Sequence, residues 1–186
     1  METLRVLVCD DEPGMRTGVA RALRDFSFPV SAVHEEVRFA VEQAESGEQA
    51  IEMLTASPPH ILLLDHKLPG ISGLDVLDHV AEQKLDMLTI MITAYASIET
   101  AIRATRQGAY DFLAKPFTPA ELRNAVRKAG EHVIVSKQAR ELAREKRHLR
   151  FQFISVLAHE LKAPLGAVEG YLQVMRDRTA GDDPAV

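Results

Sequence analysis

Five short apolar runs divide the first 115 residues, and segments with helical spacing lie between them. The runs are 4–9, 37–44, 61–65, 87–93 and 110–114. Strands that alternate with helices favour a parallel sheet covered on both faces. The run 61–65 has no polar residue before its last position, as expected for a strand buried on both faces. The sequence therefore predicts an α/β fold with a five-stranded, parallel, doubly wound sheet.

The segments between the runs supply the helices of this fold. Apolar spacing predicts helices over 14–26, 48–56, 74–81 and 97–107, with Gly108 as the C-cap of the last. The segment Ser27–Arg38 is longer and less regular than the other connections. We interpret it as a surface loop and assign it no function.

A long helix is predicted after the last run. Thr118 is a suitable N-cap and Pro119 a suitable first-turn proline. From there only Gly130 weakens the helical pattern for more than 40 residues. A helix of this length is unusual in a lone domain and normal in a signalling linker. The last five residues, 182–186, resemble the start of another helix, so we expect the chain to be a truncated part of a longer protein.

The middle of this helix carries a partial heptad repeat. Leu142, Leu149 and Val156 follow one another at intervals of seven residues, and Phe153 lies between the last two. Lys146 occupies a position that a coiled coil would normally fill with an apolar residue. The segment 134–150 is therefore interpreted as a helical linker and a candidate coiled coil.

Composition excludes several classes of protein. No apolar stretch approaches the ~18 residues that a membrane helix needs. The start METLRVLVCDD lacks a signal peptide's basic region and cleavage site, and the one cysteine, Cys9, excludes an internal disulfide. These features favour a cytoplasmic protein. Residues 1–118 have a net charge of −8 and residues 119–186 one of +3, but the basic residues alternate with glutamates, as on a solvated or coiled-coil helix face. No nucleic-acid partner is expected.

Polar residues stand where four of the apolar runs end. They are Asp10 with Asp11, Asp65, Thr93 and Lys115. In a parallel sheet these run ends lie along one edge, where α/β proteins bind their ligands. A lone aspartate after a strand is usually a turn or helix cap. Four such run ends in this order instead predict a site, in which Asp10, Asp11 and Asp65 hold Mg²⁺.

The same residue types can transfer a phosphoryl group. A carboxylate can be phosphorylated as a covalent intermediate, and Asp65 stands alone at the end of the most buried strand. Lys115 would pair with the phosphate or with the aspartate as a point charge. The Thr93 hydroxyl could donate a hydrogen bond to a phosphate oxygen.

Residues 1–118 resemble the receiver domain of response regulators, which has a flavodoxin-like fold. The matching motifs are CDDE at 9–12, LD at 64–65 with LPG at 68–70 and Gly73, MITA at 91–94 and KPF at 115–117. The resemblance implies that Asp65 is the phosphoacceptor, that Asp10 and Asp11 help to hold Mg²⁺, and that Lys115 is the family's lysine. It also implies that Thr93 and Phe112 form a switch whose aromatic ring turns inward. Residues 95–117 especially resemble receivers of the nitrogen-regulator type.

A second candidate site lies in the long helix. Glu160 follows His159 and could orient the imidazole or take its proton, and Pro164 would kink the helix close by. A histidine on a helix is most often only solvated. Residues 151–175 nevertheless resemble the first helix of a histidine-kinase dimerisation and phosphoacceptor domain, with the motif SVLAHELKAPL at 155–165. That resemblance implies that His159 receives a phosphoryl group from ATP with help from Glu160.

These predictions combine into a domain plan and three functional hypotheses. The plan is a receiver over 1–118 with its last helix from 119 to about 133, the linker over 134–150, and a truncated phosphoacceptor helix over 151–186. The first hypothesis is the N-terminal part of a hybrid histidine kinase, a homodimer when intact. Its partners would be an upstream histidine kinase or phosphotransfer protein and a downstream receiver. Without an ATP-binding domain, the chain alone should not use ATP.

Two alternatives remain open. One is a stand-alone response regulator that acts as a phosphorylation-switched protein-binding module. The other is a regulator with a basic DNA-binding tail, which is disfavoured because no helix-turn-helix pattern follows residue 119.

Overall fold

The computed structural model describes residues 1–30, 35–94 and 105–180. The chain forms two compact units, Met1–Gln138 and Ala139–Val186. Among the described residues, no helix combines the length and apolar character that crossing a bilayer requires.

The first unit is built on one six-stranded sheet. Its strands are β1 (Glu2–Cys9), β2 (Ser27–Val30), β3 (Glu35–Ala44), β4 (Ile61–Asp65), β5 (Leu88–Thr93) and β6 (Asp111–Ala114). Their order across the sheet is β2-β3-β1-β4-β5-β6. Every neighbouring pair is parallel except β2 with β3. The flavodoxin-like prediction is confirmed, but the sheet is mixed and has one more strand than the sequence predicted.

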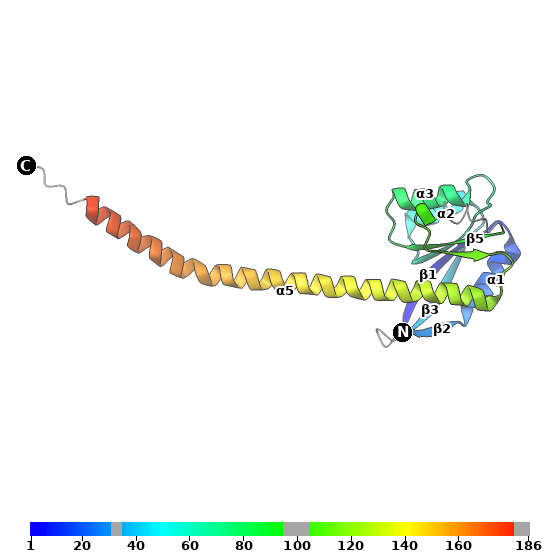
Figure 1. The fold of residues 1–186 in the computed structure, drawn as a ribbon, viewed down its shortest axis with the longest axis horizontal. Coiled ribbons are helices and arrows are strands. Elements are labelled where there is room, and N and C mark those ends of the chain that lie inside the picture. Colours follow the sequence, from blue (N-terminus) through cyan, green and yellow to red (C-terminus); the bar gives the residue numbers. More distant parts are fainter. Residues whose placement is uncertain (31–34, 95–104, 181–186) are drawn as a thin grey trace, which may run out of the picture. The chain divides into compact units, whose positions relative to one another are not determined.

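Helices cover both faces of this sheet, as Figure 1 shows for α2 and α3 on one side and the start of α5 on the other. The helices are α1 (Pro13–Arg24), α2 (Gly47–Ala56), α3 (Gly73–Glu82) and α5 (Pro119–Ala180). Helix α1 and the first turns of α5 share one apolar cluster with the sheet, whereas α2 and α3 share the other. Because both faces are covered, β4 is buried at every position. Most of the predicted helix 97–107 lies outside the described residues.

The prediction of a surface loop over Ser27–Arg38 was wrong. This segment forms β2 and the first residues of β3. Phe28 and Val30 point inward while Ser27 and Pro29 are exposed, so the alternation of an edge strand is present. A proline is tolerated there because an edge strand has no further neighbour to bond. The proline and the nearby polar residues hid the strand from sequence reasoning.

Aromatic packing holds β2 at the edge of the sheet. The Phe28 ring stacks on Phe39 with 5.8 Å between ring centroids and on Phe26 with 6.1 Å. Its edge also lies against Gly130 of α5, where an added Cβ would come within 2.9 Å of the ring. The extra strand therefore extends the core between the sheet and α5.

Helix α5 begins as the sequence predicted. The Thr118 hydroxyl accepts the Glu121 N–H at 3.2 Å, and the Glu121 carboxylate accepts the Thr118 N–H at 2.7 Å. This reciprocal cap satisfies donors that a helix N-terminus leaves unpaired. The helix continues to Ala180, so the predicted linker 134–150 is helical throughout.

Candidate functional site

The polar residues predicted to share one sheet edge lie together there. Asp10 and Asp11 follow β1, Asp65 ends β4, Thr93 ends β5 and Lys115 follows β6. All four strands are parallel, so their carboxyl ends meet at the same edge. The backbone N–H of Lys115 donates to the Thr93 carbonyl at 2.8 Å and continues the pairing of β5 with β6.

One lysine bridges two buried carboxylates. The Lys115 Nζ lies 2.8 Å from Asp10 Oδ2 and 3.3 Å from Asp65 Oδ1. Asp10 is 0% exposed and Asp65 is 6% exposed. Isolated charges at such depth would be costly, and a shared cation offsets part of that cost. One positive charge still faces two negative ones, so the site keeps an excess of negative charge.

Hydrogen bonds fix the turn that carries the two N-terminal aspartates. Asp10 Oδ1 accepts the Glu12 N–H at 2.9 Å. The Arg16 guanidinium donates to the carbonyls of Asp10 at 2.7 Å and of Asp11 at 3.1 Å. Because both acceptors are carbonyls, Arg16 orients the backbone and leaves the Asp11 carboxylate to the site.

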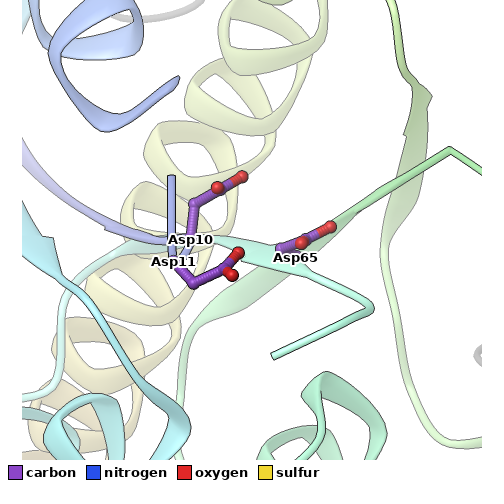
Figure 2. A group of neighbouring side chains, drawn as sticks. All are labelled: Asp10, Asp11 and Asp65. Carbon is purple, nitrogen blue, oxygen red and sulfur yellow. The ribbon is translucent and has the colours of Figure 1, made fainter. Parts of the chain in front are cut away.

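The three carboxylates form a group suited to a divalent cation. Oxygen atoms of Asp10, Asp11 and Asp65 lie within 4.8 Å of one another. Figure 2 shows that they come from the ends of the neighbouring strands β1 and β4. Mg²⁺ prefers carboxylate oxygens and keeps several of its waters. The donor set fits this ion, and the exposed Asp11 leaves one side of the group open to solvent.

Burial and charge shift the pKa values of the central pair. Burial raises the pKa of Asp65, and the negative charge of Asp10 adds to this, while Lys115 opposes it. For Lys115, burial alone would lower the pKa, but the hydrogen bond to Asp10 and the charges of both carboxylates together raise it. The lysine therefore remains a cation, and Asp65 is a more basic carboxylate than an exposed aspartate.

The loop after Asp65 is held by contacts that sequence reasoning missed. The Lys67 N–H donates to the Asp65 carboxylate. The Glu48 carboxylate of α2 accepts the Ile71 N–H at 3.1 Å and so ties this loop to a neighbouring helix. No periodicity or spacing in the sequence relates Glu48 to a backbone group 23 residues away.

Gly73 occupies the tightest point behind the site. An added Cβ there would lie 2.0 Å from the Asp65 carbonyl oxygen. The sequence marked Gly73 only as part of a motif. The structure shows that its lack of a side chain lets α3 begin directly against the backbone of Asp65.

The two predicted switch residues lie on neighbouring strands. Thr93 is buried at the end of β5, and Phe112 in β6 is half-buried against the apolar cluster under α2 and α3. The Cα partner of Thr93 on β6 is Ala114. Residues 95–104, which follow Thr93, lie outside the described residues. The coupled movement of Thr93 and Phe112 stays a prediction.

The second predicted site belongs to the C-terminal unit. His159 and Glu160 lie within α5, and the helix assignment continues through Pro164. Their side chains lie outside the described part of the structure. The five receiver-type residues belong to the N-terminal unit. The role of His159 therefore rests on the sequence pattern.

Comparison with known proteins identifies a family for the domain that carries this site. Residues 6–127 match the model of the response regulator receiver domain. The regulatory protein LuxO of Vibrio cholerae is 43% identical over 90 residues, which are 46% of this chain and 20% of that protein. The C4-dicarboxylate transport transcriptional regulatory protein DctD of Pseudomonas aeruginosa is 29% identical over 174 residues, which are 94% of this chain and 33% of that protein. The chain thus spans no more than about a third of either relative.

Solved structures agree with the sequence match. The receiver domain of NtrX from Brucella abortus is 33% identical with a TM-score of 0.55, covering 67% of this chain and 96% of that one. Chemotaxis protein CheY4 from Vibrio cholerae is 25% identical with a TM-score of 0.58, covering 68% and 98%. The matched domain and the lysine-bridged acidic edge lead to the same conclusion: this chain belongs to the response-regulator receiver family of two-component signalling.

Proposed function

We propose that Asp65 accepts a phosphoryl group and that the receiver regulates an attached histidine-kinase module whose phosphoacceptor is His159. The contact of Lys115 with both Asp10 and Asp65 is the observation that carries the first part. The H-box-like pattern around His159 supports the second part. The protein would act in the cytoplasm, take phosphate from an upstream kinase or phosphotransfer protein and work as a homodimer.

The transfer needs few side chains. A carboxylate oxygen of Asp65 attacks the phosphorus of a donor phosphohistidine. The O–P bond to Asp65 forms while the N–P bond breaks, and the released imidazole takes a proton from solvent. Mg²⁺ held by Asp10, Asp11 and Asp65 would neutralise charge on the phosphoryl group.

Lys115 and Thr93 would position the product. The Lys115 ammonium lies 3.3 Å from Asp65, close enough to pair with a phosphate placed there. The Thr93 hydroxyl would donate to a phosphate oxygen. Catalysis would then rest mainly on positioning and charge stabilisation, as is general for phosphoryl transfer.

Intact-mass measurement after incubation with acetyl phosphate and Mg²⁺ tests the acceptor. Wild type should gain one phosphoryl group, and Asp65→Asn should gain none. Asp11→Asn keeps the nucleophile and should need a higher Mg²⁺ concentration for the same yield. An undiminished adduct on Asp65→Asn would refute the assignment.

The alternative function is a response regulator whose phosphorylated receiver binds a protein partner. It is favoured by the similarity to DctD, which extends over 94% of this chain, far beyond the receiver match. The two functions differ in their need for His159. An isolated kinase ATP-binding domain with labelled ATP should label Asp65→Asn at His159 if the kinase proposal holds. The absence of a label at His159 would favour the regulator.

A further inference from the structure

An apolar line runs along the exposed part of α5 after the receiver. Leu142 is 59% exposed, Leu149 is 64% exposed and Phe153 is 65% exposed. Large apolar side chains at this exposure are costly when they line up on one helix face. The line therefore has the character of a contact surface.

The spacing along this line alternates between three and four residues. The positions 139, 142, 146, 149 and 153 hold Ala, Leu, Lys, Leu and Phe. An average of 3.5 residues is the repeat of a left-handed coiled coil, in which such residues form the seam between helices. In heptad notation, Leu142 and Leu149 are d residues, and Ala139, Lys146 and Phe153 are a residues.

The charged residues beside the seam of one helix would attract those of a second, identical helix. Glu145 occupies a g position and Arg150 the following e position. In a parallel, in-register pair of identical helices, each g residue faces the next e residue of the other helix. Glu145 of one copy would meet Arg150 of the second copy, twice by symmetry. In an antiparallel pair, g faces g and e faces e, so this match is lost.

Lys146 specifies the same arrangement. A single lysine at an a position costs stability but selects register and oligomeric state. Its four-carbon stem can cover the seam while its ammonium reaches the rim. There it would lie near Glu145 of the second copy. Arginines at 140, 144 and 147 take the outward b and f positions of the heptad.

We propose that residues 139–153 pair with the same segment of a second copy of this chain as a parallel, in-register, two-stranded coiled coil. This pairing goes beyond the proposed phosphoryl chemistry, because it needs neither Asp65 nor His159. In such a pair, the receiver of each copy precedes the paired segment in the chain.

Charge reversal tests the partner and its orientation. Sedimentation equilibrium of the full chain should show a concentration-dependent dimer. Glu145→Arg and Arg150→Glu, each alone, should weaken the dimer by about tenfold, since two symmetric pairs are lost. The double variant should restore it. Lys146→Leu should strengthen association. A monomer at all concentrations, or a dimer indifferent to the single reversals, would overturn the proposal.

Disulfide trapping tests the register. Leu142→Cys should form a dimer disulfide with its counterpart under mild oxidation. Arg144→Cys, two residues away at an outward f position, should not. The native Cys9 is buried, so it should not interfere. Equal trapping at both positions would refute a specific seam. Acetyl phosphate labelling of the same variants should remain normal, so a failed coiled coil leaves the Asp65 assignment untouched.

Discussion

Gly73→Ala should damage the phosphoacceptor site without touching any of its polar side chains. The new Cβ would lie 2.0 Å from the Asp65 carbonyl oxygen, whereas real Cβ atoms essentially never come closer than 3.0 Å. Since the obstacle is backbone, either α3 or the end of β4 must move by about 1 Å. Overpacking of this kind costs about 1–3 kcal/mol of stability.

The same displacement should also slow phosphorylation of Asp65. A misplacement of about 1 Å at a reacting group can cost roughly 100-fold in rate. The assay is the initial rate of adduct formation with acetyl phosphate, followed by intact mass, together with the melting temperature of the same sample. The variant should remain folded but react roughly 100-fold more slowly.

Gly18→Ala is the matched control. An added Cβ at Gly18 in α1 meets nothing within 4 Å, so this substitution should leave the rate unchanged. In a helix, alanine should stabilise relative to glycine by about 0.5–1 kcal/mol. A Gly73→Ala variant that reacts as fast as Gly18→Ala would refute the argument that close backbone contact positions Asp65.

Three other predictions concern buried or half-buried side chains of the N-terminal unit. Lys115→Met leaves Asp10 buried without its cation, so chemical denaturation should show a loss of about 3 kcal/mol, which added Mg²⁺ should partly restore. Burial and the charge of a nearby arginine lower the pKa of His60, whose Nδ1 accepts a backbone N–H of β1 at 2.9 Å. Below pH 6.5 the unfolded chain therefore binds more protons than the folded chain. The free energy of unfolding in urea should have its full value above pH 6.5 and should fall as the pH drops from there towards the lower pKa of folded His60. The substitution His60→Asn should flatten this pH dependence. Phe28→Ala should cost about 3–5 kcal/mol in urea unfolding, because its buried ring contacts the rings of Phe26 and Phe39, whereas the exposed Pro29→Ala should cost far less.

Each of these has a result that would contradict it. Stability of the lysine variant equal to wild type without Mg²⁺ would mean that the buried pair is not an energetic unit. A wild-type stability that is constant between pH 8 and pH 5 would remove the role given to the imidazole acceptor. A Phe28→Ala variant as stable as the proline variant would mean that β2 adds nothing to the core.

Sequence patterns predicted the site because the carboxyl ends of parallel strands must lie along the same edge of a sheet. The alternation of apolar runs with helical segments was enough to bring Asp10, Asp65 and Lys115 to one edge across 105 residues of chain. That inference needs only strand direction and layer order, which local hydrophobicity reveals. The same local signals located the Thr118 cap and the long helix that follows it.

What the sequence by itself determined is therefore the layered α/β plan, the identity of the acidic edge and the heptad spacing of α5. The tertiary structure alone decided the sixth strand, the hydrogen bond from Ile71 to Glu48 and the close contact of Gly73 with the Asp65 backbone. Each depends on contacts between segments distant in the chain, such as the Phe28 ring against Phe39 and Gly130. Hydrophobic periodicity records which face of a segment is buried, but not which other segment buries it, and so these features appear only when the chain is folded.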